Sequence, residues 1–593
     1  MARQNLTKAL ALLLAVMMLI GLTACAKTPA SSTTPTESKS EPTSSAEEKL
    51  YYNKTGYPIC DTPILVKAAS KQPSVSDKNH QWSGHADSTV IDQLAYYKDK
   101  LGIDVSLDTY INDDWTTQLT MMLTIKQLPD MIWDSNLTVA DINKYGEDGF
   151  FVDMAKYMDL MPNFKAYCDE YTDLAKYITT DAGKIYTTVR YNNSNVENSL
   201  RYFLNKDWMD RLGAKIPTTI DEFYQLLIRF RDEDPNGNGK KDDIPFEYST
   251  YTQGYSNKLL QNAFGIRTSQ VVSNDQLPIH ADDNGKVVLL DDNYKEMVRF
   301  LCRLYNEGLM DKDSFSIDFN QTKAKVNDNL VGAYGNSAPF LCYAGTNVND
   351  DSSKAYGMIS LASQYNGNKH IVVLNNAVTT NGRFMISADS RYPEACVRLL
   401  DFIYTEDGSV LGASGQEGVH WNWEENELLG IRNRQMVDPP ANENWESKES
   451  WRNSKVVLNE TLNIATARTP GNTNKTGHDA IYEFAKNDTK EHWDKVAEYA
   501  GWQALCLKSA ADNNTEVIYG YPTMVYPDSV VDKRTQLTAD LLNTMKEGHA
   551  SLIIGSMEDF DAGWDKLVKD MEGAGMADLL KIEQDAYDNY TKK

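Results

Sequence analysis

Between residues 64 and 133 the sequence alternates short apolar runs with longer amphipathic ones, and this alternation restricts the fold more than any other feature. Apolar residues that recur every three or four positions are typical of helices that pack one face on a core, whereas short apolar runs are typical of buried strands. The strands are expected at 64–70 (ILVKAAS), Ile103–Leu107 and Asp130–Trp133, and the helices at Val90–Leu101 and before Pro129. Strand, helix, strand, helix, strand predicts an α/β domain with a largely parallel sheet.

Ligands of such sheets bind at the carboxyl ends of the strands, and Trp133 and Asp134 occupy that position here. Further along, Thr219 with Glu222 three residues later fits a capping box at the start of a helix over Ile220–Asp232. Later helices are expected at Asn293–Glu307, Tyr392–Tyr404, Asn487–Ala510 and in the Trp564–Tyr590 region. With 593 residues, of which 41% are hydrophobic, the chain can form two or more packed domains.

The N-terminus indicates the compartment. Arg3 and Lys8 precede an apolar run that is shorter than the roughly 20 residues of a membrane-spanning helix, as in a secretory signal peptide over residues 1–24. The run ends in Leu22-Thr23-Ala24-Cys25, which resembles the lipobox of bacterial lipoproteins and makes Cys25 the expected site of lipid (palmitate) attachment. An ordinary signal peptide with an accidental cysteine is the alternative.

Residues 25–59 are expected to form a flexible tether, because the segment at 27–49 is rich in Ser, Thr, Pro and Glu and nearly devoid of apolar side chains. The mature protein would then be extracytoplasmic and anchored by lipid to the outer face of the cell membrane, without spanning it. The remaining cysteines are scattered singly, which favours buried free thiols, although disulfides stay open: Cys60, Cys168, Cys302, Cys342, Cys396 and Cys506.

The charge balance argues against some partners. Acidic residues outnumber basic ones by 84 to 59, and the formal net charge of −25 argues against nucleic acid and against anionic membrane surfaces. It does not exclude an anionic ligand, since a pocket can carry its own local charge. The aromatic content includes 33 Tyr and 11 Trp, whose faces suit the apolar faces of sugar rings, although most such residues simply pack.

Several segments together resemble one family. They are LPDMIW (128–133), GFFVDMAKYMDLMPN (149–163), GKIYTTVRY (183–191), residues 205–245, residues 294–315, RYPEACVRLLDFIY (391–404), SGQEGVHWNW (414–423) and AYDNY (586–590). In this order they resemble the extracellular solute-binding proteins (family 1) of bacterial ABC sugar importers, of the large oligosaccharide- or alginate-binding lipoprotein type. The lipobox and the tether also fit that family.

The resemblance implies a two-lobed, periplasmic-binding-protein-like α/β fold with discontinuous lobes, a hinge and a central ligand cleft. Lobe one would comprise 60–186 and 356–422, and lobe two 190–352 and 426–593. The expected function is to capture an oligosaccharide between the lobes and deliver it to the permease subunits of an ABC importer, without catalysis. The protein is expected to be a monomer.

The stretch DPNGNGKKDDIP (234–245) has the spacing of a calcium loop. Counting from Asp234, the ligand positions of an EF-hand fall on Asn236, Asn238, the Lys240 carbonyl and Asp242, with Gly239 at the sharp turn. Position 12 is Pro245, which has no ligating side chain, so this is not an ordinary EF-hand. The resemblance implies that Asp243 is the bidentate ligand instead. We expect one structural Ca²⁺; the alternative is a turn that binds nothing.

The ligand-contacting residues are expected where the lobes would face each other. The candidates are Trp133, Asp134, Trp421, Trp423, Tyr186, Tyr334, Asn336 and Trp82. Trp421 and Trp423 would point to the same side if their segment is extended, and glycines around Tyr334 and Asn336 let a ligand approach the backbone. Trp208 and Trp564 lie in helical patterns and are expected in the core.

Two other classes compete with the binding-protein interpretation. A secreted carbohydrate-active enzyme would share the signal peptide and the aromatic residues, but the sequence has no H-E-x-x-H, G-x-S-x-G or G-x-x-x-x-G-K-[ST] motif. Two catalytic carboxylates cannot be chosen from so many acidic residues. A peptide-binding lipoprotein or adhesin would share the anchor and the tether, but it would not explain the ordered sugar-importer segments.

Overall fold

The computed structural model describes residues 50–592 except for 72–83, 111, 136, 171, 181, 189–200, 250–251, 269–275, 337–354, 375–383, 427–430, 444–450, 452–453, 456–508, 523 and 525. Cys25, Trp82 and most of the helix expected at Asn487–Ala510 lie outside the described residues. Contacts divide the chain into Met1–Leu50 and Tyr51–Lys593, and the fold below is that of the second part. Within the described residues no helix has the length and apolar character needed to cross a membrane.

The first sheet has the strand order β12-β4-β1-β3-β2. Its central strands β1 (Ile64–Lys71), β3 (Ile103–Tyr110) and β4 (Met131–Trp133) are mutually parallel, as the alternation of the sequence predicts. The edge strands β2 (His85–Ala86) and β12 (Met385–Ile386) run antiparallel to their neighbours.

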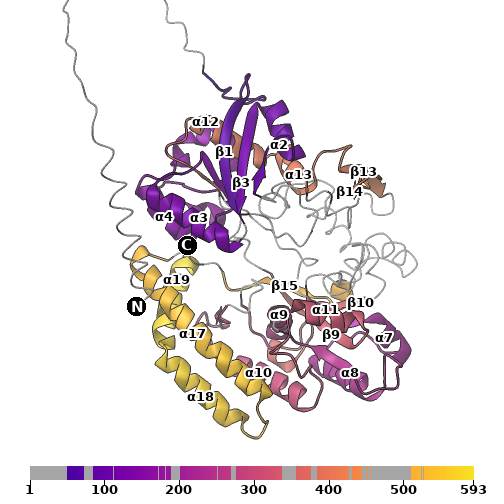
Figure 1. The fold of residues 1–593 in the computed structure, drawn as a ribbon. Coiled ribbons are helices and arrows are strands. Elements are labelled where there is room, and N and C mark those ends of the chain that lie inside the picture. The colour runs from indigo at the N-terminus through magenta and orange to yellow at the C-terminus, as the bar shows by residue number, and fades with distance from the viewer. Residues whose placement is uncertain are drawn as a thin grey trace, which may run out of the picture. The chain divides into compact units, whose positions relative to one another are not determined.

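Helices connect and cover this sheet (Figure 1). The helix expected at Val90–Leu101 forms as α2 (Asp92–Tyr96) continued by a π-helical turn, η1 (Tyr97–Leu101), and it ends at Gly102 in the left-handed region with φ 71°. The other elements are α3 (Asn112–Ile125), α4 (Val139–Glu147), η2 (Met154–Leu160), α5 (Pro162–Glu170), α6 (Thr172–Ile178), α12 (Pro393–Ile403) and α13 (Glu406–Ser414).

The first sheet is buried on both faces, as parallel sheets usually are. Successive residues of β4 alternate between two apolar cores: Met131 and Trp133 join the core under α12, and Ile132 joins a smaller one with Trp115 of α3. Residues from the second half of the chain thus complete a sheet built from the first quarter.

The second sheet has the order β10-β5-β9-β6. Its strands are β5 (Arg201–Asn205), β6 (Ile244–Glu247), β9 (Val331–Asn336) and β10 (Ala355–Met358), with β6 parallel to β9 and β5 antiparallel to both β9 and β10. Its helices are α7 (Lys206–Leu212), α8 (Ile220–Asp232), α9 (Gln253–Ala263), α10 (Asp292–Asn306) and α11 (Phe319–Asn327). Trp208 and Trp564 are both buried in its core, as predicted.

The helix α8 has the bounds predicted from its capping signal, but the capping pattern is split between two residues. The Thr219 hydroxyl accepts the Glu222 backbone N–H at 3.2 Å, as in a capping box. The Glu222 carboxylate instead accepts the backbone N–H and the hydroxyl of Thr218, each at 2.8 Å. The reciprocal half of the motif therefore lies one residue earlier than the sequence indicates.

Short two-stranded sheets and a C-terminal group of helices complete the described chain. The sheets pair β7 (His280–Ala281) with β8 (Val287–Val288), β11 (Ile371–Leu374) with β15 (Glu516–Tyr519), and β13 (Trp421–Asn426) with β14 (Ile431–Met436). A 3-10 turn, η6, covers Gln364–Asn366. The C-terminal helices are α17 (Asp528–Ile554), α18 (Phe560–Gly573) and α19 (Met576–Thr591), so the helical region expected at Trp564–Tyr590 is two helices separated at Gly575, whose φ is 96°.

Two boundaries expected from the sequence fall inside ordered structure. Residue 356 lies within β10, which pairs with β5 of the second sheet, so the segment that follows does not enter the first lobe at that point. Ile59 is fully buried and its N–H donates to the Leu101 carbonyl at 2.8 Å. The Tyr51 hydroxyl donates to Glu394 of α12 at 2.5 Å. Residues 51–59 therefore pack on the first sheet's helices instead of extending the tether to residue 59.

Candidate functional site

The first candidate region is the edge of the first sheet where its parallel strands end. Lys71 of β1 lies opposite Tyr110 of β3, and Ser70 lies opposite Trp133 of β4, so three carboxyl ends meet at one edge. Asp134 follows directly, with φ 50° and 8% of its surface exposed. A non-glycine residue in this left-handed conformation is uncommon and often marks a functional position.

Trp133 itself is fully buried, in the core beneath α12. Tyr186 is 3% exposed and belongs to the other core of the same sheet, so the structure does not bring these two predicted ligand contacts together. The indole N–H of Trp133 is buried without a hydrogen-bond partner in the described part of the chain. In this conformation Trp133 supports the edge from inside, and Asp134 presents the polar group.

This edge also carries an aromatic pair that was not predicted from the sequence. Tyr110 ends β3 and stacks on Trp115 of α3, with ring centroids 5.9 Å apart and planes inclined by 20°. Trp115 is fully buried, whereas Tyr110 is partly exposed. The signal available in the sequence was the position of Tyr110 at a strand end, directly before a helix, where a ligand-stacking side chain would be placed.

The second candidate region is the corresponding edge of the second sheet. Glu247 ends β6 and lies opposite Tyr334 of β9, and Asn336 ends β9. Tyr334 is 1% exposed and packs on Phe203 with ring centroids 5.6 Å apart, and Asn336 is fully buried. The structure therefore places Tyr334 and Asn336 at a strand end, as a ligand site requires, but covers both side chains in this conformation.

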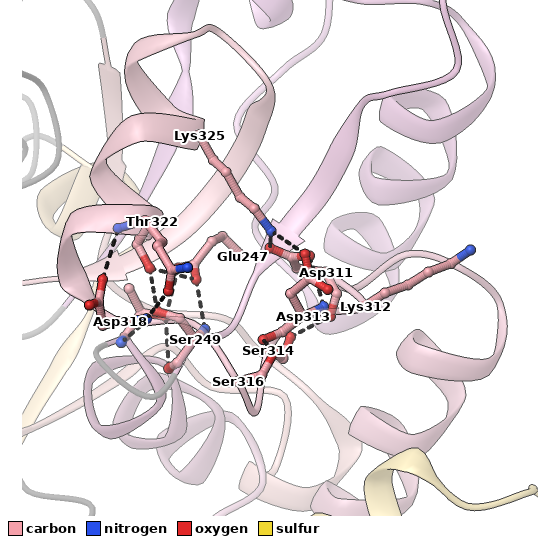
Figure 2. Close-up of polar contacts among 12 residues, drawn as sticks. Glu247, Ser249, Asp311, Lys312, Asp313, Ser314, Ser316, Asp318, Thr322 and Lys325 are labelled. Carbon is pink, nitrogen blue, oxygen red and sulfur yellow. Dashed lines mark hydrogen bonds and ion pairs between the residues drawn. The ribbon is translucent and has the colours of Figure 1, made fainter.

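Glu247 is a buried carboxyl group that the sequence analysis did not single out. It is fully buried and accepts hydrogen bonds from the Ser249 N–H at 2.7 Å and the Thr252 hydroxyl at 2.7 Å. The Thr322 hydroxyl of α11 lies 3.4 Å from the Glu247 carboxyl and 2.8 Å from the Ser249 hydroxyl. Figure 2 shows this cluster beside a second one, in which Lys325 of α11 contacts Asp311 at 2.7 Å and Asp313 at 2.9 Å.

Burial raises the pKa of Glu247, and the hydrogen bonds from Ser249 and Thr252 oppose that effect while the nearby Asp311 adds to it. A buried carboxyl group is costly unless hydrogen-bond donors or a cation surround it. Its place at the end of β6 makes it a candidate polar group of this edge, and an acidic residue in the otherwise apolar IPFEY segment was the signal that could have found it.

Trp421 and Trp423 lie together at the start of β13, on one side of the strand as predicted. Their ring centroids are 5.0 Å apart and their planes are inclined by 85°, so the pair is edge-to-face and does not form one flat platform. Trp421 is 3% exposed and its indole N–H donates to the Gly415 carbonyl at 2.9 Å, whereas Trp423 is partly exposed. Trp423 thus offers the more accessible ring.

The loop at 234–243 is a tight turn held by hydrogen bonds between its side chains and its backbone. Gly239 has φ 73°, and its N–H donates to Asp234 at 3.1 Å. The Asn238 N–H donates to the Asn236 amide oxygen at 3.0 Å, and the Lys240 N–H donates to the Asn238 amide oxygen at 2.7 Å. The amide nitrogens of Asn236 and Asn238 lie 3.5 and 2.9 Å from Asp242 Oδ1, so alternate residues of the loop are tied to one another.

Two carboxylate oxygens in this loop are candidates for an ion. Asp234 Oδ1 and Asp243 Oδ1 are buried and have no hydrogen-bond partner within the described chain. Burial, followed by the charges of Asp234 and Asp242, raises the pKa of Asp243 to about 6. Among the described residues no three His, Cys, Asp or Glu side chains converge enough to hold a metal by themselves, so a site here needs the asparagine oxygens as well. An all-oxygen donor set with orphaned carboxylate oxygens fits Ca²⁺.

Both sheets place polar or aromatic side chains at the carboxyl ends of parallel strands, and comparison with known proteins shows what the chain is similar to. No family model matches the chain. The chain is 25% identical over 500 residues to the fructooligosaccharide ABC transporter substrate-binding protein FusA of Streptococcus pneumoniae, an alignment that covers 82% of this chain and 85% of FusA. It is 23% identical over 329 residues to the polygalacturonan/rhamnogalacturonan-binding protein YtcQ of Bacillus subtilis, covering 54% of this chain and 61% of YtcQ.

Solved structures show the same fold. FusA in complex with kestose superposes with a TM-score of 0.64 at 22% identity, covering 89% of this chain and all (100%) of FusA. The alginate-binding protein AlgQ2, solved without calcium ion, gives a TM-score of 0.58 at 20% identity and covers 91% of this chain and 100% of AlgQ2. A further FusA structure is described as an EF-hand mutant in complex with fructo-nystose. The predicted fold class and the resemblance to solute-binding proteins are thereby confirmed.

Proposed function

We propose that this chain is the substrate-binding component of a bacterial ABC importer, which captures an oligosaccharide between two lobes and delivers it to the permease without changing it chemically. The observation that carries the proposal is the similarity to FusA, which extends over 82% of this chain and 85% of that protein. A ligand that binds the closed form more tightly than the open form shifts the equilibrium between them, and the permease would recognise the closed form.

We place the ligand contacts at the two strand-end edges. Asp134 and Tyr110 are the groups that the first edge presents, and Trp423 supplies a partly exposed ring. Glu247 of the second edge is fully buried and is proposed to support that edge from inside. Trp133, Trp421, Tyr334 and Asn336 are proposed to support the contacts from inside, because each is at most 3% exposed. Trp133→Ala should therefore weaken binding and also lower the melting temperature, which distinguishes support from contact.

The proposed ligand is a neutral oligosaccharide. Asp134 is 8% exposed at the first edge, and a carboxylate there can accept hydrogen bonds from sugar hydroxyls. A ligand carboxylate at the same place would meet like charge, which is unfavourable in a partly desolvated site. FusA, which has been solved in complex with kestose and with fructo-nystose, supports this proposal.

An acidic oligosaccharide is the second candidate. Lys71 ends β1 directly opposite Tyr110 at the first edge, where its ammonium group would suit a uronic acid. The similarity to YtcQ, named for polygalacturonan and rhamnogalacturonan binding, favours this candidate, and the two are separable by a binding panel.

We further propose that the loop at 234–243 binds one structural Ca²⁺. Asp234, Asn236, Asn238, Asp242 and Asp243 would hold the ion through side-chain oxygens and Lys240 through its carbonyl. When bound, the ion would supply a cross-link between α8 and β6. The buried oxygens of Asp234 and Asp243 that lack partners support this assignment.

The protein would work outside the cytoplasm, held at the outer face of the cell membrane by a lipid on Cys25 and a tether. The lipobox-like Leu22–Cys25 sequence supports this, as does a 31% identity over 134 residues with the Bacillus subtilis lipoprotein LipO. We propose a monomer that reaches the membrane through the lipid anchor and the permease, and not through a face that binds lipid or nucleic acid.

Thermal melting of residues 26–593 against kestose, nystose, oligogalacturonides and alginate oligosaccharides tests the function. A neutral glycan that raises the melting temperature and stays intact on long incubation supports the proposal, and a shift by acidic glycans alone moves the assignment to the second candidate. Cleavage of a glycan would establish an enzyme instead. No shift with any glycan refutes oligosaccharide capture.

A further inference from the structure

Two of the places where the chain passes between the two sheets begin side by side, at residues that the structure describes. It leaves the first sheet after Thr188 and begins the second at Arg201, and it returns from β11 to reach the first sheet again at Phe384. Thr188 and Phe384 form an antiparallel bridge in which each N–H donates to the other's carbonyl at 3.1 Å. The outgoing and returning segments are therefore joined to each other where they meet the first sheet.

The outgoing segment packs on the last turn of α4, where the ring of Tyr186 lies against Gly146. A Cβ atom added to Gly146 would lie only 2.3 Å from Cγ of Tyr186, so the ring lies directly on the helix backbone. Gly146 has an ordinary helical φ, so its backbone does not require glycine. Glycine in a helix is less stable than alanine by about 1 kcal/mol, and the contact with Tyr186 is the feature of the structure that accounts for its presence.

Polar contacts hold the Tyr186 ring at its hydroxyl end as well. The Tyr186 hydroxyl donates to Glu147 Oε1 at 3.3 Å, and the Lys184 ammonium contacts Glu147 Oε2 at 2.5 Å. The Lys184 ammonium also lies 6.0 Å from the centre of the Tyr186 ring. Glu147 of α4 thus binds both Lys184 and Tyr186 of the outgoing segment, directly after Gly146 in the helix.

The backbone between these side chains is fixed as well. The Ile185 carbonyl accepts the Met154 N–H at 2.7 Å, and the Ile185 N–H donates to Asp153 at 3.2 Å. On the returning side, Met385 and Ile386 form β12 and pair with β4. Both crossings are therefore anchored to the first sheet, and Tyr186 is the side chain that anchors the outgoing one.

We propose that Gly146, Glu147, Lys184 and Tyr186 form a crossing clamp, which holds the paired crossings to the first sheet and thereby positions the pivot of lobe closure. This inference rests on the proposed function and gives Tyr186 a positioning role in place of a ligand contact. If the clamp is loosened, the crossings must be ordered when the ligand binds, and the ligand's apparent affinity falls although no contact with it is lost.

The test compares two glycine substitutions at equivalent helix positions. Gly146→Ala displaces the Tyr186 ring, whereas a Cβ atom at Gly573, in the last turn of α18, would meet nothing within 4 Å. Hydrogen exchange followed by mass spectrometry, on the protein without ligand, measures peptides that cover 184–188 and 384–388. We expect Gly146→Ala to speed exchange about tenfold in both peptides and Gly573→Ala to change neither.

A second variant covers the case in which Gly146→Ala does not fold. Glu147→Gln keeps the side-chain shape but removes the charge that holds Lys184, and we expect about threefold faster exchange in the same two peptides. Exchange in peptides from β1 and β3 should stay unchanged, because the clamp acts on the crossings. Faster exchange throughout the first sheet, or in 184–188 without 384–388, would overturn the proposal, since either result describes packing that does not join the crossings.

The binding arm uses whichever glycan of the melting panel shifts the wild-type protein most. Gly146→Ala should weaken its binding at least fivefold and Gly573→Ala should not. Equal affinities for the two variants would overturn the positioning role. If no glycan shifts the wild-type protein, the proposed function fails, while the exchange experiment still decides whether the clamp exists.

Discussion

Acidification should destabilise this protein through one buried histidine, His549 of α17. The side chain is 9% exposed, and its Nε2 atom has no hydrogen-bond partner in the described part of the chain. It packs near Tyr294 of α10, with ring centroids 6.2 Å apart, and Tyr294 in turn packs near Trp564 of α18 at 6.3 Å. His549 therefore lies between three helices, in surroundings that solvate a charge poorly.

Burial lowers the pKa of His549 from 6.5 to about 4. Above pH 6.5 both the folded and the unfolded protein carry this histidine in neutral form, so it contributes no dependence on pH there. As the pH falls below 6.5, the unfolded chain takes up a proton that the folded protein does not, until the folded pKa near 4 is reached. Stability is therefore lost as the pH falls through that window.

The magnitude follows from the difference between the two pKa values. Each pKa unit corresponds to about 1.4 kcal/mol, so the free energy of unfolding should fall by roughly 2 kcal/mol between about pH 7 and pH 5 from this group alone, and by roughly 3 kcal/mol when the pH reaches about 4. Since a folded domain is stable by only about 5–15 kcal/mol, a loss of this size is measurable.

The assay compares wild-type protein with His549→Leu by urea denaturation at a series of pH values. Leucine has a similar volume and no charge, so the difference between the two unfolding free energies isolates the histidine from the many carboxylates that also titrate. We expect the difference to grow by about 2 kcal/mol in favour of the variant between about pH 7 and pH 5. His85→Gln is the control, because His85 is exposed on the first sheet's edge strand. Parallel curves for His549→Leu and wild type would refute the reasoning.

Three further predictions follow from the structure. Thr219→Ala should lower the free energy of unfolding by about 1 kcal/mol in urea denaturation, because it removes the acceptor of the Glu222 N–H; no change would show that Thr218 is the effective cap. Chelation of Ca²⁺ should lower the melting temperature of the wild-type protein but not that of Asp243→Asn, whose melting temperature should already be low; equal chelator sensitivity would remove Asp243 from the proposed ligand set. Trp421→Ala should weaken binding of the glycan identified by melting about fivefold to tenfold in calorimetry, and an unchanged affinity would exclude Trp421 from the site.

Local patterns in the sequence predict local elements well. The parallel strands β1, β3 and β4 and the helix α8 follow from apolar spacing and from Thr219, because these signals act within a few residues. The pairing of β12 with β4 does not follow from any local pattern, since it joins residues about 250 positions apart and depends on the core that they share.

The sequence predicts that Trp133 and Asp134 lie at a strand end, but it does not predict which of them is buried. A strand-end rule places Trp133 and Asp134 at the edge correctly, yet it does not tell which of two adjacent residues faces the core. The structure answers this for β4, where the cores on both faces of the sheet take up alternate side chains and Trp133 falls to the larger one. When both faces of a sheet are covered, the side chains on both faces are apolar. The sequence then has no polar residue that shows which side chains point to which core.

Glu247 and Gly146 were missed for a different reason, because each is locally unfavourable. A carboxyl group in an apolar strand and a glycine in a helix both lower the stability of the element that contains them. The structure supplies what the sequence lacks: Ser249 and Thr252 donate to Glu247, and the Tyr186 ring covers Gly146. Residues that contradict their own element are expected where function and stability conflict. In this chain Glu247 ends a strand at an edge proposed to hold the ligand, and Gly146 lies beside the crossing proposed to guide closure. Each residue lowers the stability of its own element at a place where the proposed function requires it.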